Sequence, residues 1–303
     1  MVLNSKLLIM LKLNLVYPER SDIKYNIVKF SDSQVQFTLD DPESLDREDV
    51  LIYSRMSWED VQVIIAVKAA LDEACINYSF LNVPYFLGAR SDRKFSEGGS
   101  NYLKDVICPI INSLEFNEVV VLDPHSDVLE GCLEVYTKGS NVDLVKWAIS
   151  EIYPHIHPMD QPYFIVSPDA GALKKIYDVA KAINYTNDII VASKHRDIPT
   201  GKILSTDVPI YAAQRDSLKD FIIIDDICDG GRTFIEIAKI IEAKVPSARI
   251  YLIVTHGIFS QGFYELNDYF TDIFCTNSVW DNDTVKYAFG QGPRLPKQLN
   301  VFQ

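Results

Sequence analysis

The chain has 303 residues, of which 48% are hydrophobic and 23% charged, a globular composition with enough length for two domains. Its formal net charge of −13 argues against a nucleic-acid partner, because nucleic-acid phosphates are bound by clustered Lys and Arg. Five cysteines without CxxC or other metal-ligand spacing indicate reduced, mostly buried thiols in a cytoplasmic protein.

An apolar stretch near the start of the chain, Leu7 to Val16, is interrupted by Lys12 and Asn14. It is too short to cross a membrane and lacks a small-residue cleavage site, so no membrane partner is expected. The stretch predicts an edge strand.

Farther along the chain, short apolar runs alternate with helical periodicity, which is typical of an α/β fold with a largely parallel sheet. Strands are predicted at Val50–Tyr53, Tyr78–Val83, Glu118–Leu122, Tyr163–Val166, Ile189–Ala192, Phe221–Ile224 and Ile250–Val254. Helices are predicted at Trp58–Ala74, preceded by a capping-box pair of Ser57 and Asp60, and at Ala172–Ile183. The proline-rich segment 153–162 is non-periodic and predicts a boundary between two domains, residues 1–153 and 154–303.

The segment from Phe221 to Phe234 carries the most functional information. A buried strand runs into two adjacent carboxylates, Asp225 and Asp226, and then into a glycine turn and a helix. Carboxylates can accept hydrogen bonds from vicinal ribose hydroxyls, and backbone N–H groups at a helix N-terminus attract a phosphate. The segment therefore indicates a sugar-phosphate site. The simpler alternative is an ordinary strand-to-helix turn in which an Asp caps the helix.

Four further groups of polar residues directly follow predicted strands. They are Asp123-Pro124-His125-Ser126-Asp127, Ser167-Pro168-Asp169-Ala170-Gly171, Ser193-Lys194-His195-Arg196-Asp197 and Thr255-His256-Gly257. A single His after a strand is usually structural, and Lys-x-Arg in a loop is usually a solvated pair. Ligands of open α/β sheets bind outside the carboxyl ends of the strands, so the joint placement of these groups favours a functional edge.

Eight ordered motifs resemble the ribose-phosphate diphosphokinase family, also called phosphoribosyl diphosphate (PRPP) synthetases. The motifs are Lys29-Phe30-Ser31-Asp32, Val83 to Lys94, Asp123-Pro124-His125, Ser167 to Gly171, Lys194-x-Arg196, the segment around Asp225, Thr255 to Ser260, and Thr276-Asn277. The resemblance runs from about Lys29 to the end of the chain.

This resemblance implies two tandem phosphoribosyltransferase-like, Rossmann-like domains with mostly parallel sheets. It implies transfer of the β,γ-diphosphate of ATP to the anomeric hydroxyl of a ribose 5-phosphate, with release of AMP and with Mg²⁺ as cofactor. Because relatives build their sites at subunit interfaces, a homo-oligomer, a dimer or larger, is also implied.

The resemblance also assigns residues to roles. Ribose phosphate would be bound by Asp225, Asp226, Asp229, Gly230, Gly231, Arg232 and Thr233, and ATP by Phe30, Asp32, Gln34, Arg90, Ser91, Asp92 and His125. The implied metal ligands are His125 and Asp169. The implied catalytic residues are Lys194 and Arg196, on a loop that continues through Asp197 to Gly201. The role of His195 stays open.

Some positions depart from the family pattern. Arg232 stands where relatives have a small residue in the phosphate turn, Ser91 replaces a Gln, and Gln34 replaces a Glu. Ala172 replaces a Gly, and the family's last helix and tail have no counterpart after Leu299. We therefore expect neither the regulation by ADP or phosphate nor the hexamers of typical relatives, and a dimer is the simplest expectation.

Arg232 leaves the acceptor open. Its fork of donors suits an extra phosphate, as in the ADP-ribose used by divergent phage-type relatives that rebuild NAD⁺, which would put the protein in a host cytoplasm. Alternatively, Arg232 points to solvent or forms a salt bridge. A PRPP-using phosphoribosyltransferase and a non-catalytic regulatory homologue also remain possible, although retention of Lys194 and Arg196 counts against the latter.

Overall fold

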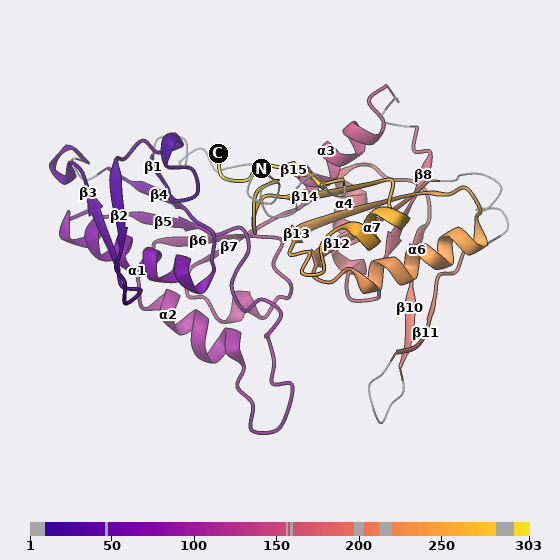
Figure 1. Cartoon of the computed structure of the whole chain (residues 1–303), viewed down its shortest axis with the longest axis horizontal. Coiled ribbons are helices and arrows are strands. Elements are labelled where there is room, and N and C mark those ends of the chain that lie inside the picture. Colours follow the sequence, from indigo (N-terminus) through magenta and orange to yellow (C-terminus); the bar gives the residue numbers. More distant parts are fainter. Residues whose placement is uncertain are drawn as a thin grey trace. The chain divides into compact units, whose positions relative to one another are not determined.

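The computed structural model describes residues 10–45, 48–155, 157, 160–196, 203–211, 220–282 and 294–303 (Figure 1). Two compact units are present: unit 1 comprises Met1–Ser140 and Val301–Gln303, and unit 2 comprises Asn141–Asn300. The main sheet of each unit is parallel and is flanked by helices, which confirms the predicted α/β class.

Unit 1 contains a five-stranded parallel sheet with the strand order β1-β4-β5-β6-β7. The strands are β1 (Leu11–Asn14), β4 (Val50–Tyr53), β5 (Ser79–Asn82), β6 (Glu118–Leu122) and β7 (Tyr136–Gly139). The predicted edge strand is confirmed as β1, which lies at the edge of this sheet. Residues 7–9 of the predicted stretch lie outside the described residues. The helices of this unit are α1 (Trp58–Glu73) and α2 (Cys108–Asn112), the latter preceded by a π-helical turn at Leu103–Ile107.

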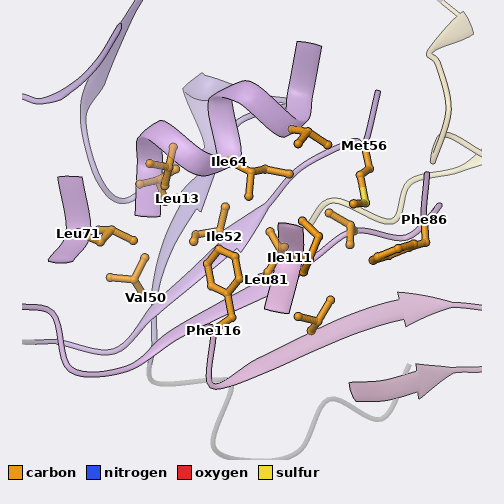
Figure 2. Close-up of a cluster of buried hydrophobic side chains, with 14 of the residues drawn as sticks. Leu13, Val50, Ile52, Met56, Ile64, Leu71, Leu81, Phe86, Ile111 and Phe116 are labelled. Carbon is orange, nitrogen blue, oxygen red and sulfur yellow. The ribbon is translucent and has the colours of Figure 1, made fainter. Parts of the chain in front are cut away.

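The start of α1 forms as its sequence predicts. The Ser57 hydroxyl accepts from the Asp60 backbone N–H at 3.2 Å, and the Asp60 carboxylate accepts from the Ser57 backbone N–H at 2.7 Å, a complete capping box. The buried face of α1 then packs on the sheet: Ile64 and Leu71 lie in one buried cluster with Val50, Ile52 and Leu81 of the strands (Figure 2). A separate antiparallel hairpin, β2 (Tyr25–Lys29) and β3 (Val35–Leu39), contributes Phe37 and Leu39 to this core.

Unit 2 contains a six-stranded parallel sheet with the order β15-β14-β13-β12-β8-β9. The strands are β8 (Tyr163–Ser167), β9 (Ile189–Val191), β12 (Asp220–Cys228), β13 (Arg249–Gly257), β14 (Asp272–Thr276) and β15 (Lys297–Leu299). An antiparallel ribbon, β10 (Ser193–Arg196) and β11 (Ile203–Asp207), follows β9. The helices are α3 (Val142–Ile152), α4 (Leu173–Ala182), α6 (Arg232–Lys244) and α7 (Tyr264–Tyr269).

The side-chain alternation of β12 divides unit 2 into two apolar layers. Ile222 and Ile224 pack with side chains of α3 and α4, whereas Phe221 and Ile223 pack with side chains of α6 and α7. All four side chains are at most 1% exposed. A strand buried on both faces reads as a continuous apolar run, which explains why Phe221–Ile224 could be predicted from sequence.

The division between the units falls at residues 140 and 141, and the proline-rich segment 153–162 belongs to unit 2. Helix α3 is grouped with unit 2 because Leu144, Val145 and Ala148 pack in the layer that contains Ile222 and Ile224.

The last residues of the chain return to unit 1. Phe302 is fully buried in a cluster with Met10, Leu51 and Tyr53, and its backbone carbonyl accepts from the buried Asn14 amide at 3.1 Å. No sequence periodicity indicates this contact, because it joins residues 288 positions apart.

The five cysteines are all free thiols, three of them buried. In the part of the chain that the structure describes, no helix combines the length and the apolar character needed to cross a membrane.

We predict that Phe302→Ala destabilises unit 1 by about 3–5 kcal/mol, the usual cost of removing a buried aromatic ring. Urea unfolding followed by circular dichroism measures the change. Gln303→Ala, at an exposed neighbouring position, is the control and should leave the unfolding midpoint unchanged. An unfolding curve of Phe302→Ala that superposes on that of the unmodified protein would contradict the packing described here.

Candidate functional site

The predicted sugar-phosphate residues lie at the carboxyl edge of the unit 2 sheet. Parallel pairing places β8, β12 and β13 side by side with Ile165, Ile222 and Tyr251 in register. The segments that leave these strands therefore emerge at one edge. They carry Asp169 after β8, Asp225 and Asp226 in the last part of β12, and Thr255 to Gly257 at the end of β13.

Asp226 is held by a lysine that the sequence analysis did not single out. The Lys175 ammonium on α4 donates to Oδ2 of Asp226 at 3.0 Å, and the Asp226 residue is 6% exposed. The even-numbered residues of β12 face α4, so the strand's alternation delivers the Asp226 side chain to this helix. A sequence signal did exist: a cation in the first turn of a helix opposes the helix dipole, which suggests a nearby acid.

Asp225 lies in a strongly negative environment. Burial, together with the neighbouring carboxylates of Asp226 and Asp169, raises the pKa of Asp225 well above the usual carboxyl value, although the Asp226 backbone N–H donates to it at 2.9 Å. The structure thus brings together three of the predicted acids of unit 2, Asp169, Asp225 and Asp226. Their mutual repulsion would be relieved by hydrogen-bond donors or by a cation.

The turn after β12 ends in a glycine that begins α6. Gly231 is the N-cap residue of α6 and has a φ of +79°, and a Cβ at this position would lie 2.8 Å from Leu266 Cδ2. Glycine has no side chain to cap the helix, so the alternative of an Asp cap is wrong at this position. Backbone N–H groups at the start of a helix of this length suit a phosphate.

A second loop supports this turn. The backbone N–H groups of Ile258 and Phe259 donate to the Cys228 carbonyl at 2.8 and 3.1 Å, and that of Ser260 donates to the Asp229 carbonyl at 3.1 Å. Since the second loop follows β13, the predicted Thr255–Ser260 motif serves in part to fix the path of the turn after β12.

Arg232 points outward on the first turn of α6. Its side chain is 92% exposed, and its Nε donates to Glu236 Oε1 at 3.1 Å, one helical turn away. This is the salt bridge that the sequence analysis gave as the alternative to a phosphate contact. Thr233, the next predicted residue, is half-buried at the start of the same helix.

Asp169 performs a local structural task at the start of α4. Its Oδ1 accepts from the backbone N–H groups of Gly171 and Ala172 at 2.9 and 3.1 Å, which satisfies donors at the helix start. The Ser167 hydroxyl donates to the Asp169 carbonyl at 2.7 Å and fixes the preceding turn.

His256 belongs to a buried polar network behind the site. Its Nδ1 lies 2.9 Å from the Ser278 hydroxyl, and the Thr276 hydroxyl donates to the Thr255 carbonyl at 2.6 Å. His256 is 2% exposed, so this His supports the ends of β13 and β14 from within the fold.

The predicted ATP residues of unit 1 lie on two of its loops. Arg90 is exposed after β5, and the loop that it enters is closed by backbone hydrogen bonds from Ser91 to Gly88 and from Leu103 to Ser91. The Asp92 carbonyl accepts from the Asn101 amide at 2.7 Å. His125 is exposed after β6, the neighbour of β5, and follows a buried Asp123 with a φ of +41°.

The remaining predicted ATP residues form the tip of the β2–β3 hairpin. Phe30 is 45% exposed, and Asp32 Oδ1 accepts from the Gln34 backbone N–H at 3.1 Å to shape the turn. An exposed aromatic ring on a defined turn is suited to stack on a planar base.

The predicted catalytic residues Lys194 and Arg196 lie on β10, opposite Thr206 and Ile203 of β11. Residues 197–202, which contain the rest of the predicted loop, lie outside the described residues.

The carboxylates of unit 2 fit a hard divalent cation in type and charge. Asp169, Asp225 and Asp226 offer oxygen ligands, and Mg²⁺ is commonly bound by one or two carboxylates plus substrate phosphates instead of a complete protein cage. Within the described ranges, no group of three or more His, Cys, Asp or Glu side chains is arranged so that it could hold a metal ion by itself. Of the two predicted metal ligands, His125 belongs to unit 1 and Asp169 to unit 2.

A cavity of about 470 Å³ lies in unit 2 beside the start of β8, and none of the predicted site residues lines it. It is bordered by α3, by the segment around Tyr153 and by the end of α4. The cavity therefore stands apart from the acids at the other end of the strands.

The sequence of this chain is similar to a known domain family and to several characterised proteins. Residues 135–290 match the family model of the phosphoribosyl transferase domain. The chain is 26% identical over 220 residues to ribose-phosphate pyrophosphokinase of Sulfurisphaera tokodaii, covering 72% of this chain and 71% of that protein. It is 26% identical over 262 residues to ribose-phosphate pyrophosphokinase of Mycoplasmopsis pulmonis, covering 85% and 77%.

The fold has a solved counterpart. Phosphoribosylpyrophosphate synthetase from Mycobacterium smegmatis matches 94% of this chain and 87% of its own chain with a TM-score of 0.74 and 17% identity. This likeness shows the shared fold, in agreement with the predicted pair of phosphoribosyltransferase-like domains.

We predict that Gly231→Ala weakens ribose 5-phosphate binding by about tenfold, because a Cβ in the left-handed region strains the turn and meets Leu266. Isothermal titration calorimetry measures the affinity. Gly131→Ala, in unit 1, is the control, since a Cβ there meets no atom within 4 Å. Equal loss of affinity in both variants would contradict the role given to Gly231.

We predict that Asp225→Asn stabilises the protein at pH 8, at the expense of function. A carboxyl with a raised folded-state pKa stabilises the fold below its unfolded pKa, and this stabilisation is lost as pH rises through the folded-state pKa. The variant should therefore melt about 2–4 °C higher at pH 8, and the difference should vanish below about pH 4.

Differential scanning calorimetry across this pH range makes the comparison. Asp268→Asn, at an exposed acid of the same unit, serves as the control and should show no such pH-dependent gain. A lower melting temperature of Asp225→Asn at pH 8 would mean that Asp225 is stabilised as an anion in the folded protein.

Proposed function

We propose, from the premise that the chain belongs to the phosphoribosyl transferase family, that it transfers the β,γ-diphosphate of ATP to the anomeric hydroxyl of ribose 5-phosphate. The predicted resemblance to the ribose-phosphate diphosphokinases is confirmed by the family match, by relatives named ribose-phosphate pyrophosphokinase and by the shared two-domain fold. The chain is thus an enzyme of the diphosphotransferase type.

One observation supports the proposal most strongly. Two adjacent acids and the start of α6 lie at one edge of the unit 2 sheet, and the N-cap residue of α6 is a glycine in a left-handed conformation. Vicinal hydroxyls of a ribose would donate to Asp225 and Asp226, and the 5-phosphate would accept from backbone N–H groups of residues 229–233. The spacing of acids and turn along one chain segment suits a ribose with a phosphate at its 5-position.

The reaction requires alignment and positive charge more than a covalent intermediate. The anomeric oxygen attacks the β-phosphorus of ATP, the bond between that phosphorus and the oxygen of the α-phosphate breaks, and AMP leaves. Lys194 and Arg196 are assigned to balance the negative charge that develops on the transferred group and the leaving group. Unit 2 holds the acceptor, and Phe30, Asp32, Gln34, Arg90, Ser91, Asp92 and His125 of unit 1 are assigned to ATP.

Mg²⁺ is the cofactor that this chemistry implies, and Asp169 with His125 are the residues assigned to it. When bound, the cation would neutralise phosphate charge and polarise the transferred group. The chain's own contribution is a set of carboxylate oxygens already held in place, of which Asp169 is fixed by two backbone donors.

A second acceptor, ADP-ribose, is favoured by one feature of the turn. Arg232 is exposed directly beside the helix start, so its guanidinium could exchange Glu236 for the second phosphate of a diphosphate. A surface pair of this kind contributes only about 0.3–0.5 kcal/mol, which a diphosphate contact can readily replace. The product would be ADP-ribose pyrophosphate, an intermediate for the rebuilding of NAD⁺.

We predict that the protein with ATP and Mg²⁺ releases AMP when ribose 5-phosphate is added, as measured by a coupled AMP assay. Parallel reactions with ADP-ribose give the ratio of kcat/KM for the two acceptors. If Arg232 contacts a diphosphate, Arg232→Gly shifts this ratio toward ribose 5-phosphate, whereas an unchanged ratio removes the ADP-ribose alternative.

Lys194→Ala and Arg196→Ala provide the control for contaminating activities. Each should lower kcat by about 10³-fold or more, since a cation that stabilises such a transition state is worth that much in related reactions. If AMP is released neither with ribose 5-phosphate nor with ADP-ribose, the proposed reaction is wrong.

A further inference from the structure

The Lys175–Asp226 ion pair is costly by itself, which suggests that it serves the site. Lys175 is the third residue of α4, where its positive charge faces the positive end of the helix dipole. Asp226 is 6% exposed, so both groups lose hydration when they meet. Replacing such pairs by apolar residues is often neutral or stabilising, so stability alone is a weak reason for this one.

The negative charges around Asp226 indicate what the Lys175–Asp226 ion pair does. Asp225 and Asp169 place two further carboxylates in this cluster, where burial and the charges of Asp226 and Asp169 raise the pKa of Asp225. A carboxylate beside like charges is repelled by them, so a partner of opposite charge is needed to hold its side chain in one orientation. The Lys175 ammonium, whose Nζ lies 3.0 Å from Asp226 Oδ2, is that partner for Asp226.

The pair also fixes geometry. Asp226 lies in the last part of β12, and Lys175 lies on the helix whose start is fixed by Asp169. One ammonium N–H occupies part of the acceptor capacity of a carboxylate, which has about four lone-pair directions. The ion pair can therefore orient Asp226 and still allow that carboxylate to accept from a hydroxyl.

We propose that Lys175 is a positioning residue for the ribose: it orients the Asp226 side chain, which accepts hydrogen bonds from the sugar's vicinal hydroxyls. This inference rests on the proposed function, since it assigns the sugar to Asp226. Lys175 acts through Asp226 and makes no contact with the reacting atoms.

Lys175→Met, which keeps the length of the side chain and removes its charge, tests the proposal. We expect the KM for ribose 5-phosphate to rise about 10–100-fold, the usual effect of removing a partner that orients a ligand-binding group. The KM for ATP should stay within about twofold of its original value, because the ATP residues belong to unit 1. Lys175→Arg should restore most of the affinity, and Lys181→Met on the exposed end of the same helix should have no effect.

A double-mutant cycle with Asp226→Asn separates positioning from a direct contact. If Lys175 acts through Asp226, Lys175→Met should weaken ribose 5-phosphate binding by less than about twofold in the Asp226→Asn background. A full, additive loss in that background, or unchanged affinity in the single variant, overturns the proposal. Calorimetric titration of ribose 5-phosphate measures each affinity without turnover, and the melting temperature of each variant verifies folding.

The proposed reaction and the proposed role of Lys175 are tested by different outcomes. If the unmodified protein binds ribose 5-phosphate but releases no AMP, the proposed reaction is wrong and the binding cycle still tests Lys175. If AMP is released and Lys175→Met leaves ribose 5-phosphate binding unchanged, the reaction stands and the role of Lys175 is wrong.

Discussion

The burial of β12 on both faces is the constraint on which the candidate site depends. Phe221 to Ile224 lie between two helical layers, so the strand cannot slip by one residue without exchanging the side chains of both layers. That fixed register determines where the strand delivers Asp225 and Asp226. The parallel neighbours β8 and β13 bring Asp169 and the supporting loop to the same edge, so ordinary apolar packing sets the positions of the polar groups.

Those polar groups oppose one another until something binds. Burial and neighbouring carboxylates raise the pKa of Asp225, Lys175 offsets part of the negative charge at Asp226, and α6 begins at a glycine, which has no side chain to cap the helix. Each feature is unfavourable or neutral for stability taken alone. In the proposed function, a ribose with a 5-phosphate would satisfy them together, since its hydroxyls would donate to the acids and its phosphate would accept from the turn.

Features that depend on neighbouring residues could be predicted from the sequence. The runs Val50–Tyr53 and Glu118–Leu122 became strands with those bounds, and the capping box of Ser57 formed, because burial and capping are encoded by neighbouring residues. The Lys175–Asp226 pair and the burial of Phe302 were missed, since each joins residues far apart in the chain. The ribbon of β10 and β11 was missed as well, because its polar residues show no apolar alternation.

The central claim is that unit 2 holds the ribose phosphate by the end of β12 and the start of α6. A crystal structure with ribose 5-phosphate tests it most directly. In that structure we expect sugar hydroxyls within hydrogen-bond distance of Asp225 and Asp226, and a phosphate bound by the backbone N–H groups of residues 229–233. A sugar phosphate bound elsewhere, with the turn at Gly231 unoccupied, would contradict it.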